Sequence, residues 1–364
     1  MRSRHGGAWQ NDGRVSDLLL HSLAEFGEII LPSLDLVGAR SVVEIGSEEG
    51  LFTRELLAWA EARGAAVTCV DPAPSDGLVS LVEGSSAGEL LTARSLDALA
   101  DLGPADVYLV DGDHNYYTVS KELRLLFEET DGGPPLAFVH DVGWPAGRRD
   151  MYYSPEGLPA EAVHPHDYAK GAVVGRSELV AHGFRGAGQF AWARHEGGPA
   201  NGVLTAVEDF LSEHPHVELH KVPCIFGLGV LFDRESPYAG ELRRLLGPHE
   251  GSRLLERLER NRLDLFLRVL EMQDGTAELE RAVEDWSLRT RDVEVENRAL
   301  WGRVRELEKH VAEVAREVDA VVRARSFAVA EVLSRFHGRF GDQRGLSRQR
   351  LRQVLEANQS AAAP

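Results

Sequence analysis

Apolar and polar positions along this chain follow two alternating periods. Between about residues 15 and 232, short apolar runs typical of buried strands are separated by segments in which apolar residues recur at helical spacing. Buried strands alternating with amphipathic helices predict a mostly parallel sheet covered on both faces, a doubly wound α/β domain. The predicted strands are 41–45, 66–70, a weaker one at 78–82, 107–110 and 136–139, and the predicted helices include 51–62, one beginning near Tyr117, and 202–213.

Two further apolar runs, 217–222 and 225–232, close this domain. The chain between them is too short for a parallel crossover, so they should form a terminal antiparallel pair. Before them, residues 144–194 lack clear periodicity and are rich in Gly, Pro, aromatic and His residues. So long a segment inside a compact domain is usually a functional loop or lid, and we expect substrate contacts there.

The periodicity changes again between Leu279 and Val321, where apolar residues recur at alternating spacings of three and four. β-branched residues at heptad a positions with Leu at several d positions favour a parallel two-stranded coiled coil, and the polar Asn297 at one a position would set its register. Arg303 at g can face Glu308 at e of a partner helix. The alternative is a single helix packed on its own domain. The a positions include Val283, Val304, Val311 and Val318, and the d positions Leu279, Leu300 and Leu307.

These patterns divide the 364 residues into five segments. We predict an N-terminal arm and helix at 1–34, the α/β domain at 35–235, a helical linker at 236–278, a C-terminal α-helical coiled coil at 279–325 and an Arg-rich tail at 326–364. The coiled coil would make the protein a homodimer. The tail should be solvated, and docking to an acidic partner or a membrane surface is the alternative.

Composition excludes some classes of protein. A net charge of −18 argues against a general nucleic-acid binder, because neutralisation of phosphates by Lys and Arg dominates such affinity, and it leaves a small molecule or a protein as partner. The two cysteines, Cys69 and Cys224, lie in apolar runs and should be buried, inert thiols. No run reaches the roughly 20 apolar residues that span a bilayer. We therefore expect a soluble, cytoplasmic protein without a membrane span.

The first candidate site is the segment 42–50, which reads as a strand, a tight glycine turn and the start of a helix. Such a turn brings the backbone close to a nucleotide-like ligand. The G-x-G-x-x-G fingerprint of dinucleotide sites is absent, and Glu48 and Glu49 occupy the turn that would hold a pyrophosphate. S-adenosylmethionine carries a sulfonium and an ammonium group and no phosphate, so an acidic turn suits it. Asp71, after the second strand, can accept hydrogen bonds from both ribose hydroxyls.

Glu44-Ile45-Gly46 with Gly50, followed by Val70-Asp71, resembles the first two motifs of the class I S-adenosylmethionine-dependent methyltransferases, which have a Rossmann-like fold. With Asp111-Gly112-Asp113-His114 and the helix at 202–211, the chain is similar to the metal-dependent sugar O-methyltransferases of macrolide and aminocoumarin biosynthesis and to the group labelled cephalosporin hydroxylases. The resemblance covers about residues 35–233. The cofactor-binding residues that it implies are Glu44, Gly46, Ser47, Gly50, Asp71, Ser85 and Asp111, with Ser85 placed near the adenine after the third strand.

A second candidate site lies at the ends of the fourth and fifth predicted strands. Asp111 and Asp141 follow these neighbouring strands, so both carboxylates can reach one cation. The resemblance implies that Asp111, His140 and Asp141 bind Mg²⁺. Imidazole suits Mg²⁺ poorly, so either His140 is not a ligand or the site accepts a softer ion such as Mn²⁺.

A base that removes a proton from the acceptor hydroxyl is expected in the same motif. Asp113 and His114 are the two candidates, and His114 is favoured because imidazole titrates near neutral pH. The alternative is that both residues only cap the helix that begins near Tyr117.

Together these residues predict a Mg²⁺-dependent O-methyltransferase that uses S-adenosylmethionine and acts on a hydroxyl of a sugar-containing or secondary-metabolite acceptor. A non-catalytic S-adenosylmethionine-binding or scaffold protein, assembled through its coiled coil, is the competing hypothesis. A nucleotide-dependent oxidoreductase is a third, and Glu48 and Glu49 count against it.

Overall fold

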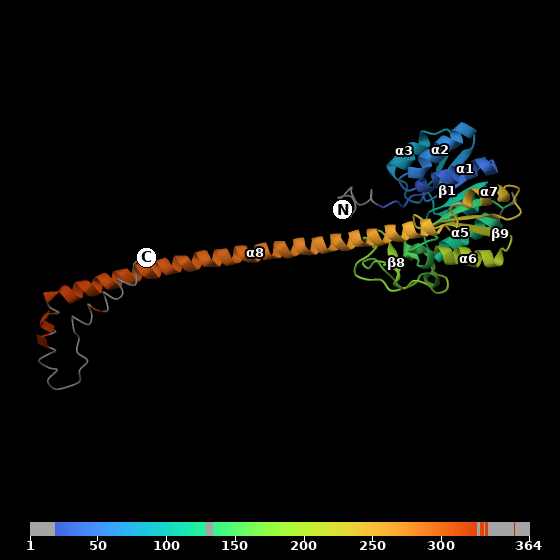
Figure 1. Cartoon of the computed structure of the whole chain (residues 1–364). Helices are drawn as coiled ribbons and strands as arrows, with labels where there is room; N and C mark the ends of the chain where they lie inside the picture. Colours follow the sequence, from blue (N-terminus) through green and yellow to red (C-terminus); the bar gives the residue numbers. More distant parts are fainter. Residues whose placement is uncertain (1–18, 129–133, 326–327, 331, 334–352, 354–364) are drawn as a thin grey trace. The chain divides into compact units, whose positions relative to one another are not determined.

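A computed structural model shows the arrangement of the chain (Figure 1). It divides into two compact units, residues 1–275 and 276–364. Residues 236–275, predicted as a linker, therefore belong to the first unit. Most of the predicted N-terminal arm and most of the predicted Arg-rich tail lie outside the described part. The described residues are 19–128, 134–325, 328–330, 332–333 and 353.

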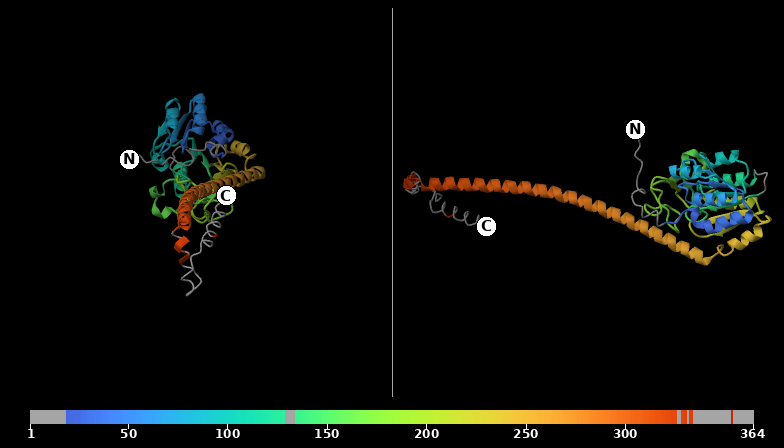
Figure 2. Two further views of the ribbon diagram at one scale, coloured as in Figure 1. Left: turned by 90° about the vertical axis from the view of Figure 1, so that its left-hand side faces the viewer. Right: turned by 90° about the horizontal axis from the view of Figure 1, so that it is seen from above.

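A seven-stranded sheet forms the centre of the first unit. The first five strands are parallel (Figure 2). β10 runs antiparallel to β9, as the sequence predicted, and it also pairs antiparallel with β5. The chain order reverses beside β1, the place where doubly wound sheets open a crevice for ligands. In sheet order the strands are β3 (Gly88–Leu91), β2 (Ala66–Val70), β1 (Ser41–Ile45), β4 (Val107–Val110), β5 (Leu136–His140), β10 (Leu228–Asp233) and β9 (Val217–Val222).

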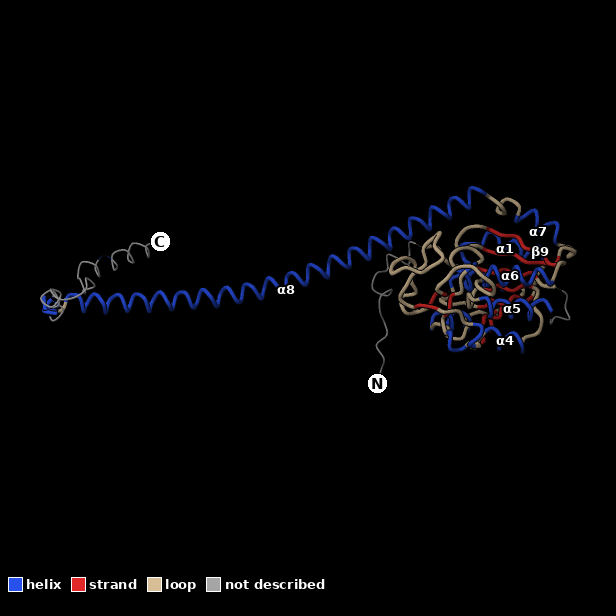
Figure 3. The backbone as a smooth tube through the Cα atoms, turned by 90° about the horizontal axis from the view of Figure 1, so that it is seen from below, coloured by secondary structure: helices blue, strands red, loops and turns tan. Residues whose placement is uncertain are grey.

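Helices cover both faces of this sheet (Figure 3). Successive strand residues point to opposite faces, so Val42 packs in one core and Val43 in the other. Both faces are therefore apolar, which explains the apolar runs of β4 and of β5 up to Val139. One layer holds η2 (Leu23–Phe26), α1 (Gly27–Val37), α2 (Leu51–Arg63), α3 (Asp76–Glu83) and α7 (Ala239–Leu246), and the other holds α4 (Ser95–Asp101), α5 (Tyr116–Glu128) and α6 (Val203–Glu213).

The strand predicted at 78–82 is wrong, because this segment is the helix α3. Ser75 caps α3, since its hydroxyl accepts a hydrogen bond from the backbone N–H of Leu78 at 3.1 Å. Leu78 and Val82 then fall one turn apart on the buried face. The third strand is instead β3, which begins only at Gly88.

The segment predicted as a loop or lid contains short elements of its own. A three-stranded sheet forms in the order β6 (Met151–Tyr152), β8 (Ala191–Ala193) and β7 (His166–Asp167). The short helical turn η3 (Ala146–Arg148) connects β5 to this sheet, and two further turns, η4 (Pro155–Gly157) and η5 (Ala160–Ala162), lie between β6 and β7. This arrangement follows directly after β5, so it is anchored at the edge of the sheet where the candidate residues lie.

Beyond α7, the chain forms one uninterrupted helix, α8 (Arg253–Arg323), of 71 residues. Its first turns belong to the first unit, where Leu263, Phe266 and Leu270 are buried. Among the described residues, no helix has the length and apolar character that crossing a bilayer requires.

One buried acid should make the stability of the domain depend on pH. Burial raises the pKa of Glu122 on α5 from 4.5 to about 7. The folded state thus binds this proton more tightly than the unfolded chain, so stability is greatest below about pH 4.5 and falls by about 3 kcal/mol as the pH rises through 7. Glu122→Gln should therefore raise the free energy of unfolding at pH 8 and change it little at pH 5, as measured by urea denaturation. The exposed Glu83→Gln is the matched control, and an equal gain at both pH values would contradict the assignment.

Candidate active site

The carboxyl ends of β1, β2, β4 and β5 meet at one edge of the sheet. Ile45 is in register with Val70 on one side and with Val110 on the other, and Val110 is in register with Val139. Residues that follow these strands directly are therefore brought together. They include most of the residues that the sequence identified: Gly46, Ser47, Asp71, Asp111, Asp113, His114 and Asp141.

The glycine turn after β1 packs tightly against the end of β4. Gly46 has φ +83°, and a Cβ atom at this position would lie 2.2 Å from the backbone oxygen of Asp111. Gly50 has φ +76° at the start of α2. Both positions require glycine, for the conformation and, at Gly46, also for the close approach. The turn is thereby fixed with its backbone beside Asp111.

The buried side chain of Glu44 also holds this turn in place. Its side chain is buried, and Oε2 accepts hydrogen bonds from Ser47 Oγ at 2.8 Å and from Thr53 Oγ1 at 2.6 Å. Burial raises the pKa of Glu44, and these hydrogen bonds act against that shift. Glu44 therefore joins β1, the turn and α2 into one network.

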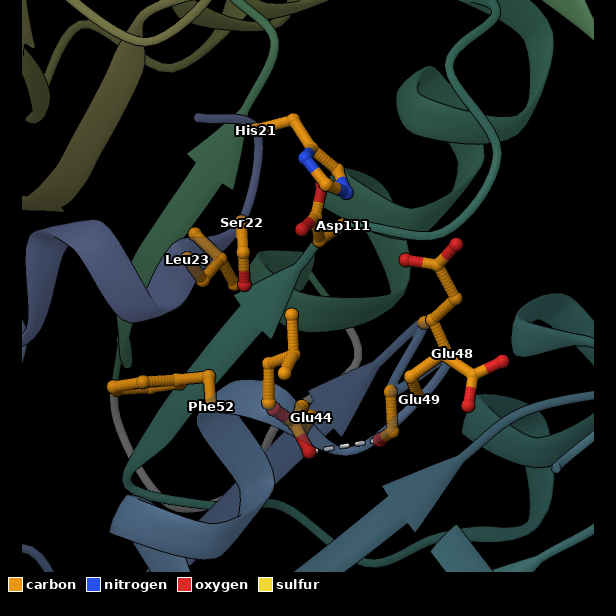
Figure 4. A pocket seen from close by; sticks show the side chains of 11 residues that line it. His21, Ser22, Leu23, Glu44, Glu48, Glu49, Phe52 and Asp111 are labelled. Carbon is orange, nitrogen blue, oxygen red and sulfur yellow. Dashed lines mark hydrogen bonds between the residues drawn. The ribbon is translucent and has the colours of Figure 1, made fainter. Parts of the chain in front are cut away.

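A pocket opens above this turn (Figure 4). Its wall is acidic: Glu44, Glu48, Glu49 and Asp111 all contribute, and burial raises the pKa of Glu48 while nearby His21 lowers it. Three residues of the N-terminal segment close the side opposite Glu48 and Glu49. No sequence pattern indicated a site role for these three residues, because they precede the first strand and belong to no motif. The lining residues are His21, Ser22, Leu23, Glu44, Gly46, Ser47, Glu48, Glu49, Leu51, Phe52 and Asp111.

Asp71 lies at the end of β2, beside the pocket rather than in its wall. Oδ2 accepts a hydrogen bond from the backbone N–H of Glu48 at 3.0 Å, and Oδ1 accepts one from that of Ala73 at 2.8 Å. A carboxylate has about four acceptor positions, so Asp71 can hold the turn and still accept from a ligand hydroxyl.

The placement of Ser85 after the third strand is wrong. Ser85 follows α3 and precedes β3, so it lies at the opposite edge of the parallel sheet from the pocket. There its hydroxyl donates to Glu61 at 2.7 Å. The structure therefore does not bring Ser85 together with the other candidate residues.

His140 lies beside Asp111 but is not one of the three residues whose ligand atoms cluster at this edge of the sheet. Its Nε2 lies 2.9 Å from the backbone oxygen of Ile225, which can only accept, so Nε2 carries a proton. Its Nδ1 lies 2.8 Å from Asp111 Oδ1. Burial disfavours the charged ring, but the carboxylates of Asp111 and Asp141 and these hydrogen bonds outweigh burial and raise the pKa to about 9. Both ring nitrogens therefore face hydrogen-bond acceptors, and the Nδ1 contact orients Asp111.

The structure groups His114, rather than His140, with the two carboxylates. Asp111, His114 and Asp141 each present a ligand atom, and these atoms lie within 4.8 Å of one another. Nδ1 of His114 is 3.1 Å from Asp141 Oδ2. The other oxygen, Asp141 Oδ1, is buried and has no hydrogen-bond partner among the described residues. A buried carboxylate oxygen without a partner is costly, and a cation would satisfy it.

The helix that follows is capped by neither Asp113 nor His114. Asn115 Oδ1 accepts the hydrogen bond from the backbone N–H of Thr118 at 2.9 Å, which is the N-cap contact. Asp113 is bonded to the Thr118 hydroxyl at 3.2 Å, and burial raises its pKa. Helix capping therefore does not explain the position of His114.

Comparisons with known proteins agree with this geometry. Residues 43–142 match a family described as a methyltransferase domain. This part of the chain is therefore similar to a methyltransferase domain. Similar solved structures include the SAH-bound methyltransferase PaMTH1 of Podospora anserina, with 11% identity, 62% of this chain and 84% of that chain covered and a TM-score of 0.37. Another is the O-methyltransferase of Bacillus cereus in complex with SAH, with 16% identity, 60% and 85% covered and a TM-score of 0.35. No curated protein matches the chain.

The α/β domain carries one exposed aromatic ring beside the carboxylate cluster. Tyr153 is 50% exposed, and its ring centre lies 6.3 Å from that of His114 and 6.2 Å from that of Phe190. Its neighbour Tyr152 is buried and donates to Asp150 at 2.7 Å, so it serves packing. Of the two adjacent tyrosines in this segment, Tyr153 is thus the one available to an acceptor.

Proposed function

We propose that this protein is an S-adenosylmethionine-dependent O-methyltransferase that uses a divalent cation. The observation that carries the proposal is the position of Asp111, which lines the acidic pocket and also belongs to the cluster with His114 and Asp141. One residue therefore adjoins both a site suited to a sulfonium donor and a site suited to a cation. A methyl donor and a cation-held hydroxyl would lie next to each other there.

The pocket residues suit the donor by charge and by shape. Glu44, Glu48 and Glu49 favour a ligand with positive groups, and the glycine turn leaves its backbone open to close approach. Asp71 would bind the ribose hydroxyls. Bound S-adenosylmethionine supplies an electrophilic methyl group on a cationic sulfur.

The cluster suits a cation by its donor set. Asp111 and the unpaired Oδ1 of Asp141 are hard oxygen donors of the kind that Mg²⁺ and Mn²⁺ prefer. A bound cation lowers the pKa of a hydroxyl that it holds. The acceptor would be a hydroxyl of a sugar-containing or secondary-metabolite molecule, with Tyr153 available to pack against its ring.

His114 is the proposed base. Asp141 Oδ2 accepts from Nδ1–H of His114, so the lone pair of the neutral ring lies on Nε2. Nε2 takes the proton of the acceptor hydroxyl while Asp141 stabilises the imidazolium that forms. In this arrangement Asp141 uses one oxygen for His114 and the other for the cation.

Donor binding and chelation test this proposal. Calorimetry should show S-adenosylmethionine binding to the full chain, and labelled methyl groups should pass to a hydroxyl acceptor in a screen with Mg²⁺ or Mn²⁺. Excess EDTA should remove transfer and leave donor binding intact. Absence of binding at high micromolar concentration would support the scaffold hypothesis, and full activity in EDTA would exclude the cation role.

We further propose that residues 279–325 form a parallel homodimeric coiled coil. The heptad stripe of α8 is solvent-exposed, a face that a second copy would bury. Arg303 and Glu308 are spaced for pairing between parallel helices rather than within one. The exposed stripe comprises Leu279, Val283, Trp286, Val293, Leu300, Val304, Leu307, Val311, Val314 and Val321.

Cysteines at d positions near both ends of this stripe test its orientation. In parallel, in-register helices, Leu279→Cys and Val321→Cys should each form an interchain disulfide on oxidation of the full chain, because equivalent d residues face each other. Lys309→Cys, at the outward f position, is the control and should not cross-link. A monomer in sedimentation, or cross-linking of neither end, would contradict the proposal.

A further inference from the structure

The turn between β9 and β10 has an unfavourable backbone conformation. Ile225 has φ +51°, Phe226 has φ +64° and Gly227 has φ +88°. Left-handed conformations are natural for glycine but unfavourable for other residues, most of all for a β-branched residue such as Ile. Two consecutive left-handed residues other than glycine persist only where the surrounding structure holds them, and such positions concentrate at functional sites.

Glu259, in the first turns of α8, holds this turn. Its Oε2 accepts a hydrogen bond from the backbone N–H of Ile225, and its Oε1 accepts one from that of Phe226, both at 3.0 Å. Arg262 donates to both oxygens of Glu259 at 2.7 Å, and its guanidinium lies 4.6 Å from the centre of the Phe226 ring. Both backbone donors of the left-handed pair are therefore bound by one carboxylate, whose charge Arg262 balances.

This turn reaches the candidate active site through one carbonyl. The backbone oxygen of Ile225 is the acceptor for Nε2 of His140, and Nδ1 of His140 meets Asp111. His140 is 2% exposed, so water cannot replace that acceptor without rearrangement. A continuous series of hydrogen bonds thus runs from Glu259 through the Ile225 turn and His140 to Asp111.

The same part of α8 also contacts the segment that covers the pocket. Nη1 of Arg262 donates to the backbone oxygen of Leu20 at 3.0 Å. The next three residues, His21 to Leu23, line the pocket. Glu259 and Arg262 therefore fix both the support of Asp111 and the N-terminal wall of the pocket.

We propose that Glu259, together with Arg262, is a positioning residue for methyl transfer, an inference that rests on the proposed function. By holding Ile225 and Phe226 in the left-handed conformation, Glu259 aims the Ile225 carbonyl at His140. The His140 ring is thereby fixed between the Ile225 carbonyl and Asp111. Without Glu259 the turn relaxes, His140 loses its acceptor, and Asp111 is no longer held toward its two neighbours.

The test is Glu259→Gln in the full chain, with Glu256→Gln as control. Glu256 lies one turn earlier on α8 and is exposed. Glu259→Gln should lower kcat about tenfold, the size typical of a residue that orients a ligand-holding group, and change KM for S-adenosylmethionine less than about twofold. Glu256→Gln should change neither. Arg262→Lys, which keeps the carboxylate but loses the two-point contact, should fall between them and serves if Glu259→Gln fails to fold.

Two readouts do not depend on activity. Histidine ¹⁵N NMR should show an Nε2–H of His140 that is protected from exchange with water in the parent and in Glu256→Gln, and one that exchanges faster in Glu259→Gln, because its hydrogen bond to Ile225 is lost. The Mn²⁺ affinity, measured by calorimetry, should fall about tenfold in Glu259→Gln. An unchanged His140 signal and unchanged Mn²⁺ affinity would overturn the positioning role. If no variant or parent transfers methyl groups while both readouts shift, the reaction assignment fails and the hydrogen-bond series stands.

Discussion

Asp141→Asn should reduce methyl transfer by about a thousandfold or more, because the variant loses the negative charge that holds the cation. Asn is the substitution of choice here. Asp141 has φ +59°, and Asn tolerates this left-handed conformation better than Ala, so the backbone at the end of β5 should keep its shape. Donor binding should be unchanged, since Asp141 does not line the pocket. Initial rates with labelled donor, together with calorimetry, measure both effects.

Two further variants make this result specific. Asp111→Asn should lose transfer and also bind S-adenosylmethionine more weakly, because Asp111 belongs to both the pocket and the cluster. Asp101→Asn, an exposed position at the end of α4, should behave as the parent. Retention of more than a tenth of the parent rate in Asp141→Asn would show that its charge is not required.

The sheet could be predicted from the sequence because each central strand is a short apolar run bounded by polar or glycine residues. β1, β2, β4 and β9 begin and end where the pattern placed them. The pattern failed at 78–82, where a short apolar run is compatible with either a strand or a helix. Ser75, three residues before Leu78, was the available signal for a helix. Because of this error, the third strand was predicted too early in the chain, and Ser85 was predicted to follow the strand although it precedes β3.

The sequence predicted those residues of the site that directly follow the ends of the strands. Asp111, His114 and Asp141 meet because they follow neighbouring parallel strands. The role of His140 could not be predicted, because it depends on the carbonyl of Ile225, which lies 85 residues later and is presented only by a left-handed turn. Long-range backbone acceptors leave no local pattern. The resemblance implied His140 as a ligand and left its exclusion open, and the structure adds its hydrogen bond with Asp111.

Replacing each candidate base by a neutral amide residue should show which of the two removes the proton. His114→Gln should lower kcat by about a hundredfold to ten-thousandfold, the range for removal of a general base, because no other group described beside Asp141 offers a free imidazole nitrogen. Asp113→Asn should cost less than about tenfold. Asp113 is bonded to Thr118, and burial raises its pKa, so its carboxylate supports the start of α5 rather than facing an acceptor.

The cation affinity decides what His114 does. If His114 is the base, His114→Gln should bind Mn²⁺ as tightly as the parent, and added imidazole should restore part of the rate by taking the proton in its place. If His114 is instead a ligand, Mn²⁺ affinity should fall with the rate, and Asp113 becomes the remaining candidate base. Calorimetry with Mn²⁺ and rates with and without imidazole distinguish these results. A larger loss of rate in Asp113→Asn than in His114→Gln would make Asp113 the base. Asp141 would then keep only one of its two proposed roles, binding the cation through Oδ1, and its Oδ2 would have no role in orienting a base.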